Sequence, residues 1–589
     1  MDGSHFYCAM CDYASPCGND IQKHYIRKHK NDRNFFIKCL KCKFQTKSYV
    51  SWKTHLSRRH KQRVDIDFSR SGGAQDELQN PIINDAAESI KQSCGKFALR
   101  MITQNRIPAS TVDEIISSTA NLINQANEME NKEGCQGLID GLNELKSESR
   151  RIKFFKENMN YTPPRKVFMG FSYKRRKGKM AKVSEFGYVA PVKDLLRQYL
   201  NKQDVYDEIS KGSEVNKDLM SDFADGEYMR SNEFIERHKK CLQFAFYTDS
   251  VEICSGLSAH SAKVDTFYFS ILNVGKRYRT QWSGIHVYAI CKTEFIQKHG
   301  YERIMSDFVN TMMELYEGLP MYICGRNETI YGMLVAVQAD YPAMANLAGI
   351  KTCSIKAKKI CKSCTASYRD LQYKLSVEDL EARCPALHLQ RCKELEKMSP
   401  KLRTDWGKRW GITSTSVFLK LPYLELSTQF VFDIMHGLFL GVLPQASALI
   451  IQRGLNEKYF TLPWLNSVLA GFRYSYLDTD KPEVIKRQHV FEKVCLKNTA
   501  AANKNLNYIL PLCLHDKFPA HDEYYRLFLN LTSLCTVAAS PFANHDSAGQ
   551  LQALVEHYLA VFKILYPRIP LKPKDHFLLH LPEQVFELK

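Results

Sequence analysis

The chain lacks an uninterrupted apolar run long enough to span a bilayer. Its longest apolar stretch, residues 438–451, is broken by Gly441, Pro444 and Gln445, whereas a spanning helix needs about 20 consecutive apolar residues. The N-terminus also lacks the apolar core of a secretory signal. Its 19 cysteines are therefore expected to be reduced thiols or metal ligands rather than disulfides, and we expect no membrane partner.

The usual motifs for binding nucleotide phosphates are missing too. Neither GxxxxGK[ST] nor GxGxxG occurs, and no Cys-His or Ser-His arrangement for nucleophilic catalysis stands out. We therefore expect no small-molecule cofactor.

Acidic residues are scarce relative to basic ones. The chain has 63 Asp and Glu against 82 Lys and Arg, a net charge of +19, and residues 1–63 alone hold 14 basic against 4 acidic residues. Such a segment attracts nucleic-acid phosphates by counterion release. The basic cluster 174–179 is either a nuclear import signal or a solvated charge run. These features favour a nuclear protein that binds DNA.

Two segments at the N-terminus repeat one spacing, C-x2-C-x12-H-x4-H. Two thiolates on a hairpin and two imidazoles on a helix give zinc four tetrahedral ligands, and the metal stabilises a unit too small to fold alone. We predict two ββα zinc fingers of the C2H2 class, at residues 1–31 and 32–62. The predicted ligands are Cys8, Cys11, His24 and His29 in the first finger, and Cys39, Cys42, His55 and His60 in the second.

The finger residues that would face DNA bases give a weak code. Counting back from the first histidine of each finger places Cys17, Asp20 and Lys23 in the first, and Ser48, Ser51 and Thr54 in the second. Lys23 can donate to guanine, but no arginine offers a bidentate contact. The nine-residue connection 30–38 is also long for tandem fingers. The alternative that the fingers bind protein or RNA therefore stays open.

The remainder of the chain predicts an α+β multidomain protein. A linker at 63–83 precedes a mostly helical domain, 84–240, which contains a basic segment at 164–183. The order β-β-β-α-β then follows, as in a ribonuclease H-like fold. Its predicted strands are 242–253, 264–274, 284–291 and 332–339, with helical spacing at 293–316. We assign the first part of this core to 241–364, a large helical insertion to 365–570, and the start of a last core helix to 571–589.

Several segments resemble the cut-and-paste transposases of the CACTA (En/Spm) group. The stretch Asp340-Tyr-Pro-Ala-Met-Ala-Asn-Leu-Ala-Gly349 with Cys361-x2-Cys364 is similar to their D-F-P-A…N-L-S-G…C-x-x-C stretch. Residues 432–441, FDIMHGLFLG, resemble F-D-x-M-H-x-L-x-L-G, and Tyr247-Thr248-Asp249 matches the first acidic motif. The matches cover roughly residues 240–589 in the family's order.

The resemblance implies a catalytic metal site. Enzymes of this type use two divalent metals about 4 Å apart to cleave and join DNA. Because Mg²⁺ prefers carboxylate oxygens, the resemblance assigns Asp249 and Asp340 as its ligands. From the residues alone, Asp249 is equally a solvent-facing strand residue and Asp340 a cap of the helix that starts near Pro342. The resemblance also implies a homodimer, because transposases pair two DNA ends.

A third zinc site is expected from Cys361-x2-Cys364 and His576-x3-His580. The histidine spacing places both imidazoles on one helix face, and in related recombinases similar pairs join an insertion to the core. The alternative is two core histidines and two reduced thiols. His436 competes as a ligand, although Asp433-x2-His436 is as well explained by helix capping.

One element of the family pattern is missing from the sequence. The third acidic residue, a glutamate, follows the H-x3/4-H-x-P-E segment in these transposases, and Glu583 and Glu587 come too early to match it. We therefore expect either a truncated view of a transposase that cleaves DNA or a transposon-derived DNA-binding protein without catalysis.

Overall fold

The computed structural model describes residues 82–588 and four short strands near the N-terminus. Within 82–588, the described part excludes 131–135, 160, 177–178, 213–218, 254–261, 353–357 and 475–479. The chain divides into two compact units, Met1–Ala86 and Ala87–Lys589, and the following paragraphs describe each by itself.

The N-terminal unit contains two antiparallel strand pairs. Strand β1 (Phe6–Tyr7) pairs with β2 (Ala14–Ser15), and β3 (Ile37–Lys38) pairs with β4 (Gln45–Thr46). In sequence, the first pair brackets Cys8 and Cys11 and the second brackets Cys39 and Cys42. Each predicted cysteine pair thus lies between two paired strands.

The second unit begins with the helices expected from the apolar spacing of residues 84–155. They are α3 (Ile82–Thr103), α4 (Ala109–Glu130), α5 (Gln136–Asn143) and α6 (Glu148–Asn158). Their own small core includes Ala98, Ile116, Leu145 and Phe154. The fully buried Arg151 side chain donates to Asp113 Oδ1 at 2.5 Å and to the Leu145 carbonyl at 3.0 Å, which satisfies its charge inside the bundle.

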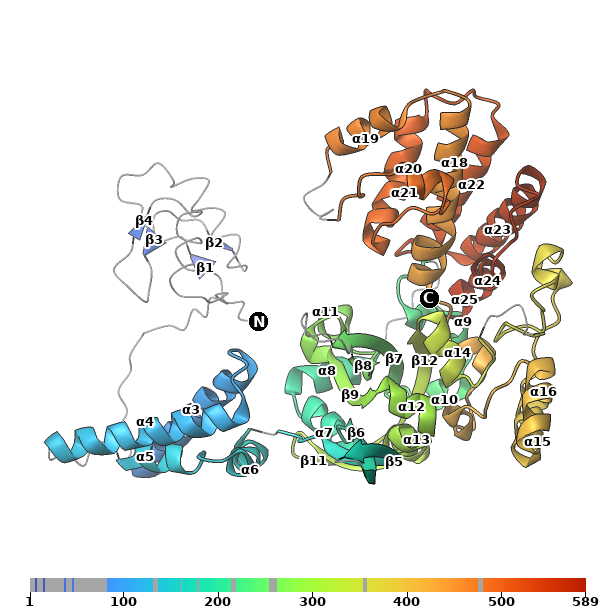
Figure 1. The fold of residues 1–589 in the computed structure, drawn as a ribbon. Helices are drawn as coiled ribbons and strands as arrows, with labels where there is room; N and C mark the ends of the chain where they lie inside the picture. Colours follow the sequence, from blue (N-terminus) through green and yellow to red (C-terminus); the bar gives the residue numbers. More distant parts are fainter. Residues whose placement is uncertain are drawn as a thin grey trace. The chain divides into compact units, whose positions relative to one another are not determined.

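A mixed six-stranded sheet forms the centre of the second unit (Figure 1). Its spatial order is β12-β7-β8-β9-β6-β5, with β12 parallel to β7 and every other neighbour antiparallel. Four of the strands match the prediction closely: β7 (Leu242–Ile253), β8 (Ala262–Ile271), β9 (Ile285–Lys292) and β12 (Gly332–Ala339). The first and fourth predicted strands are therefore neighbours.

The other two strands correct the predicted domain boundary at 241. Residues of the basic segment 164–183, expected inside a mostly helical domain, form the hairpin β5 (Arg165–Arg176) and β6 (Lys179–Val189). Strand β6 joins the sheet through Tyr188 and Val189, which pair with Ile290 and Ala289 of β9. The alternation of large apolar and polar residues along 165–189 fits a strand, but the density of Lys and Arg hides it.

Helices cover one face of the sheet and bury its core. The predicted helix at 293–316 is two helices, α12 (Thr293–His299) and α13 (Glu302–Glu317), because Gly300 between them takes φ +75°, which ends a helix and favours glycine. Phe246, Phe267 and Phe308 are fully buried in this layer. A small hairpin that the sequence did not predict, β10 (Leu319–Ile323) and β11 (Arg326–Ile330), follows α13.

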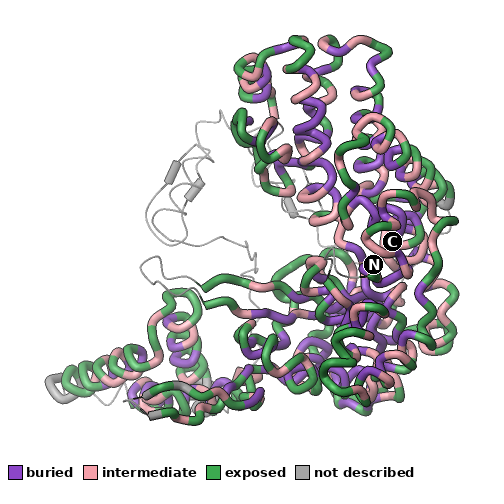
Figure 2. Tube along the Cα trace, turned by 45° about the vertical axis from the view of Figure 1, so that its right-hand side comes forward, coloured by how far each residue is buried: buried purple, intermediate pink, exposed green. Residues whose placement is uncertain are grey.

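The predicted insertion, 365–570, is helical and has its own core (Figure 2). One stretch in the described residues, Met435–Asn456, has the length and composition of a membrane-spanning helix, and 67% of its most apolar window is buried inside the protein, as in a core helix. The helices of this part are α15 (Pro385–Lys397), α16 (Pro400–Trp410), α17 (Leu426–Gln429), α18 (Leu443–Asn456), α19 (Leu462–Gly471), α20 (Arg487–Phe491), α21 (Ala500–Leu514), α22 (Glu523–Ala538) and α23 (His545–Leu565).

Short helices connect these layers. Four of them precede β7: α7 (Val192–Leu200), α8 (Gln203–Lys211), α9 (Glu227–Arg230) and α10 (Glu233–Arg237). Helix α11 (Lys276–Arg279) follows β8, and α14 (Tyr341–Leu347) follows β12. The insertion is followed by α24 (Pro573–Phe577) and α25 (Leu581–Leu588).

Candidate metal centre and acidic edge of the sheet

Two cysteines and two histidines meet in the interior although more than 200 residues separate them in sequence. One ligand atom of each of Cys361, Cys364, His576 and His580 lies within 4.8 Å of the others, and all four residues are buried. Cys361 Sγ lies 3.4 Å from His580 Nε2, and Cys364 Sγ lies 3.2 Å from His576 Nε2. The cluster could hold a metal ion.

The distances and the donor set fit zinc. Ligand atoms that lie 2.0–2.3 Å from zinc at tetrahedral angles are separated by about 3.3–3.8 Å, and the two Sγ to Nε2 distances are close to that range. Ser363 N–H donates to Cys361 Sγ at 3.4 Å, and the Cys364 thiol has a backbone hydrogen bond to Ala366. Backbone N–H donors of this kind stabilise thiolates.

The environment also favours a thiolate at one of the cysteines. Burial opposes ionisation of Cys361, but its hydrogen bond with Cys364 and the nearby His580 and His576 outweigh burial and hold the pKa of Cys361 well below the usual range. The same contact and burial raise the pKa of Cys364. The pair therefore shares one proton, which a bound metal would displace.

Two buried cations accompany the sulfur atoms. Arg383 donates to the Cys361 carbonyl at 3.2 and 2.8 Å. Lys362 is buried, donates to the Ser427 carbonyl at 2.8 Å and lies 4.1 Å from the centre of the Phe432 ring. Burial lowers the pKa of Lys362 to about 8. The negative charges of Cys361, Glu583 and Cys364 raise this pKa, but by less than burial lowers it. Sequence analysis did not identify Lys362 and Arg383, although a lysine between the two cysteines was visible.

Two of the segments that carry the resemblance, 340–349 and 432–441, meet the predicted histidine segment 576–580 in one stack of rings. Tyr341 stacks on Phe577 with ring centres 4.6 Å apart, Phe577 on Phe432 at 5.0 Å, and Phe432 on His580 at 5.4 Å. Gly441 is also explained by this packing, since a Cβ there would lie 2.6 Å from Lys574 Cδ. The stack joins α14 after β12, the segment before the π-helix Met435–Val442, and α24 with the short 3-10 helix Leu578–His580 that follows it.

Asp249 and Asp340 lie where the pairing of two adjacent strands ends, Asp249 within β7 and Asp340 directly after β12. Strands β7 and β12 are parallel, with Thr248 opposite Ala339, so each aspartate is the next residue beyond that pair. Asp249 Oδ1 accepts the Ser250 N–H at 2.8 Å, and Asp340 Oδ1 accepts the Ala343 N–H at 2.8 Å. The second contact makes Asp340 the N-cap of α14, and its capping role is thus confirmed.

Asp433 adds a third carboxylate at this level. Phe430 forms a parallel bridge with Val337 of β12, so Asp433 and Asp340 each follow the bridged pair by three residues. Burial raises the pKa of Tyr247 to about 12, together with the charges of Asp249, Asp433 and Asp340 and a hydrogen bond to Asp249. All three carboxylates therefore raise the pKa of this one phenol.

The Asp433 carboxylate is fixed by its own helix. Its Oδ2 lies 2.5 Å from His436 Nδ1, and its Oδ1 accepts the Met435 N–H at 2.8 Å. This arrangement matches the helix cap considered for Asp433 and His436. His436 is not in the Cys2His2 cluster, so the competing assignment of His436 as a ligand there is wrong. The sequence did not place Asp433 beside β12, because the register of residue 430 with β12 is a tertiary contact.

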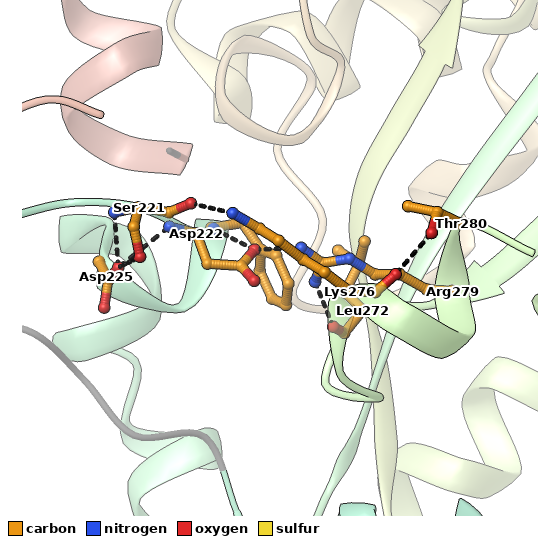
Figure 3. Close-up of polar contacts among 8 residues, drawn as sticks. Ser221, Asp222, Asp225, Leu272, Lys276, Arg279 and Thr280 are labelled. Atoms are coloured by element: carbon orange, nitrogen blue, oxygen red, sulfur yellow. Dashed lines mark hydrogen bonds and ion pairs between the residues drawn. The ribbon is translucent and has the colours of Figure 1, made fainter. Parts of the chain in front are cut away.

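A cavity of about 650 Å³ opens beside Asp433 and Tyr247, and Arg279 lines it. Figure 3 shows how Arg279 is held: it donates to the Leu272 carbonyl and to Asp222 Oδ1, both at 2.5 Å. Lys276 of the same helix donates to the Ser221 carbonyl at 2.5 Å. Helix α11 thereby fixes the segment before α9 against the wall of the cavity.

The predicted finger residues lie outside the described residues. These are the eight zinc ligands Cys8, Cys11, His24, His29, Cys39, Cys42, His55 and His60, and the base-facing Asp20, Lys23, Ser48, Ser51 and Thr54. Glu583 and Glu587 lie on α25 and line a different pocket, together with Lys362.

The comparisons identify no relative. No protein-family model matches the chain, and no curated protein matches it. The resemblance to transposases therefore rests on the residues quoted above.

Proposed function

We propose that this chain is a nuclear DNA-binding protein derived from a cut-and-paste transposase. In this proposal two N-terminal zinc fingers dock on DNA, and a ribonuclease H-like core serves as scaffold. The observation that supports the proposal is the parallel pairing of β7 and β12, in which Asp249 and Asp340 each directly follow the pair Thr248–Ala339.

We assign a structural zinc ion to Cys361, Cys364, His576 and His580. Four nitrogen and sulfur donors leave no open coordination position, as in structural rather than catalytic zinc sites. Such an ion would tie the loop before the insertion to helix α24 after it. The large helical insertion would then be closed onto the core at both of its ends.

Catalysis is the alternative, and Asp433 is the observation that favours it. A bound Mg²⁺ would supply charge stabilisation for phosphoryl transfer. Asp249 and Asp340 would hold the ion with carboxylate oxygens, each oriented by a backbone N–H. Asp433 would add a third carboxylate, since Phe430 is bridged to Val337 of β12 three residues before Asp340, and Tyr247 would orient Asp249 by their hydrogen bond.

The zinc assignment is tested by metal analysis of the full chain. Cys364→Ser should remove one zinc ion per chain, measured by inductively coupled plasma mass spectrometry. Cys535→Ser is the matched control, because Cys535 is equally buried but lies outside the cluster. An unchanged zinc content in the Cys364 variant would refute the site.

The DNA-binding proposal and its catalytic alternative are tested separately. Selection from a pool of random duplexes should enrich a sequence with wild-type protein, and Cys39→Ser should weaken binding to it. A nicking assay on supercoiled plasmid with Mg²⁺ should give no activity if the core is a scaffold. Nicking that Asp249→Asn abolishes would establish the enzyme instead, and affinity unchanged by Cys39→Ser would show that the fingers are not the anchor.

A further inference from the structure

The β5–β6 hairpin stands at one edge of the sheet and extends beyond it. Each strand has more than ten residues, but only Tyr188 and Val189 of β6 pair with the neighbouring strand β9. Strand β5 is the last strand of the sheet. Most of the hairpin is therefore supported by side chains rather than by a third strand.

One face of the hairpin is packed against the protein. Glu185 is buried and lies 2.6 Å from His299 Nε2, and Lys298 donates to the Phe171 carbonyl at 2.5 Å. Gly170 lies so close to His299 that a Cβ there would be 2.2 Å from the ring. Helices α12 and α13 thus hold this inner face in place.

The opposite face is exposed and carries aromatic and basic side chains in register. Five cross-strand pairs form it, and all ten residues are exposed: Lys166–Tyr188, Phe168–Phe186, Phe171–Ser184, Tyr173–Lys182 and Arg175–Met180. Tyr173 is 65% exposed and Met180 is 64% exposed. Large apolar side chains at this exposure, gathered on one surface, indicate a binding partner.

The three phenylalanine rings of this outer face already contact one another or basic side chains. The ring centres of Phe168 and Phe171 are 4.7 Å apart, and those of Phe168 and Phe186 are 5.9 Å apart. Lys182 Nζ lies 3.7 Å from the centre of the Phe171 ring, and Arg303 lies over Phe168 at 5.3 Å. Ordered rings lose little conformational entropy when they stack on a ligand.

The charge of the hairpin defines the class of partner. Residues 165–189 contain eight Lys and Arg against the single acidic residue Glu185, and Glu185 points to the inner face, where Lys298 and His299 pair with it. A second copy of this basic face would be repelled. A polyanion with flat rings, which is a nucleic acid, complements both the charge and the aromatic side chains.

The outer face of the hairpin lies on the same side of the sheet as Asp249. One residue from each of five strands forms a continuous row of cross-strand partners. In the order β7, β8, β9, β6 and β5, the row is Asp249, Thr266, Ile290, Tyr188 and Lys166. Residues directly opposite each other in a ladder share one face. Four strand spacings of about 4.8 Å make this row about 19 Å long.

We propose that the outer face of the β5–β6 hairpin binds single-stranded DNA, with unpaired bases stacked on Phe171 and Tyr173 and phosphates beside Lys182. Duplex bases present no ring faces to a sheet, whereas unpaired bases stack on exposed aromatics. The choice of DNA as the nucleic acid rests on the proposed function. The strand would run along the row toward Asp249, so that the fingers hold duplex and the hairpin holds a separated strand.

The test is fluorescence anisotropy with the full-length, zinc-loaded protein and a labelled oligothymidine of about 20 nucleotides. The double variant Phe171→Ala, Tyr173→Ala should bind it roughly tenfold more weakly or worse, and Lys182→Met should reduce the salt dependence of binding. The matched control is Tyr322→Ala, Tyr373→Ala, which removes two exposed aromatics outside the hairpin.

Separate readouts distinguish this proposal from DNA binding by the fingers. Duplex binding should be unchanged in the hairpin variant, whereas Cys39→Ser should weaken duplex binding more than it weakens oligothymidine binding. An oligothymidine that contains 5-bromodeoxyuridine should photocrosslink to peptides of 165–189 in the wild-type protein, whatever the stability of the variants. Unchanged affinity in the hairpin variant, a crosslink elsewhere, or tighter binding of an oligouridine RNA would overturn the proposal.

Discussion

Asp340 caps helix α14, and in the catalytic alternative we propose a second role for the same carboxylate, as a metal ligand together with Asp249. The capping role needs only an oxygen that accepts the Ala343 N–H, and asparagine provides it as well as aspartate does. Metal binding needs the negative charge. A pair of substitutions at this residue can therefore separate the two roles.

We predict that Asp340→Asn leaves the free energy of unfolding within about 0.5 kcal/mol of wild type, whereas Asp340→Ala lowers it by about 1 kcal/mol. Both variants should bind Mn²⁺ at least about tenfold more weakly, because each lacks the ligand charge. Urea denaturation and electron paramagnetic resonance titration measure the two effects. Equal Mn²⁺ affinity in wild type and Asp340→Asn would leave only the capping role.

His286 illustrates the cost of a buried imidazole. Its ring lies between Tyr199 and Phe269, with ring centres 4.6 and 4.9 Å away, and Nε2 is buried with no hydrogen-bond partner among the described residues. Burial, with a smaller effect from the charge of Lys202, lowers the pKa of His286 to about 4. The folded state therefore favours the neutral ring.

This lowered pKa predicts a specific acid sensitivity. Because the pKa is lower in the folded state, the stabilising contribution is present above about pH 6.5 and is lost as the pH falls toward 4, by up to about 3 kcal/mol. His286→Phe should remove this part of the pH dependence of unfolding, measured by denaturation at several pH values. An identical pH profile in the variant would contradict the assignment.

At the scale of the element, the β5–β6 hairpin depends on a bulge at Gly170. The register shifts between Phe168 and Gly170, and the absence of a side chain at Gly170 admits the His299 ring, which pairs with Glu185. A side chain at residue 170 would collide with the His299 ring and separate the hairpin from α12.

We predict that Gly170→Ala lowers the free energy of unfolding by roughly 1–3 kcal/mol through overpacking. Gly137→Ala is the control, since Gly137 lies in helix α5 and a Cβ there meets only Ile90, at 3.7 Å. That change should stabilise the protein by about 0.5–1 kcal/mol. Denaturant titration measures both, and a Gly170 variant as stable as wild type would show that the His299 ring can move away.

The comparison of sequence and structure differs from one element to another. Strands β7 and β12 were predicted to the residue because each is apolar, bounded by polar residues and buried. The hairpin was missed because its strand pattern is interrupted by Lys and Arg, and its pairing with β9 is not local. The Cys361–His580 cluster was predicted because zinc ligands obey spacing rules, whereas the place of Asp433 depends on a bridge to β12 that no local rule specifies.

At the scale of the whole molecule, the Cys2His2 cluster connects the two ends of the helical insertion. Cys361 and Cys364 precede the insertion, and His576 and His580 follow it. The same histidine segment leads into α25, whose Gln584 exchanges hydrogen bonds with the backbone of Phe432 at 2.5 and 3.0 Å. Removing a metal from this cluster should therefore increase the mobility of Asp433, the next residue after Phe432.

We predict that chelation of zinc loosens residues 358–366 and 573–588 while β7 and β8 stay protected. A protein whose ligands span distant segments loses local stability there when the metal leaves. Hydrogen–deuterium exchange should rise at least about tenfold in those two segments. The experiment uses a chain with Cys8→Ser and Cys39→Ser, so that the finger sites contribute no zinc of their own. If exchange in 573–588 stayed slow after chelation, the ring stack of Tyr341, Phe577 and Phe432 alone would hold the insertion closed, and the cluster would be a set of core thiols and imidazoles.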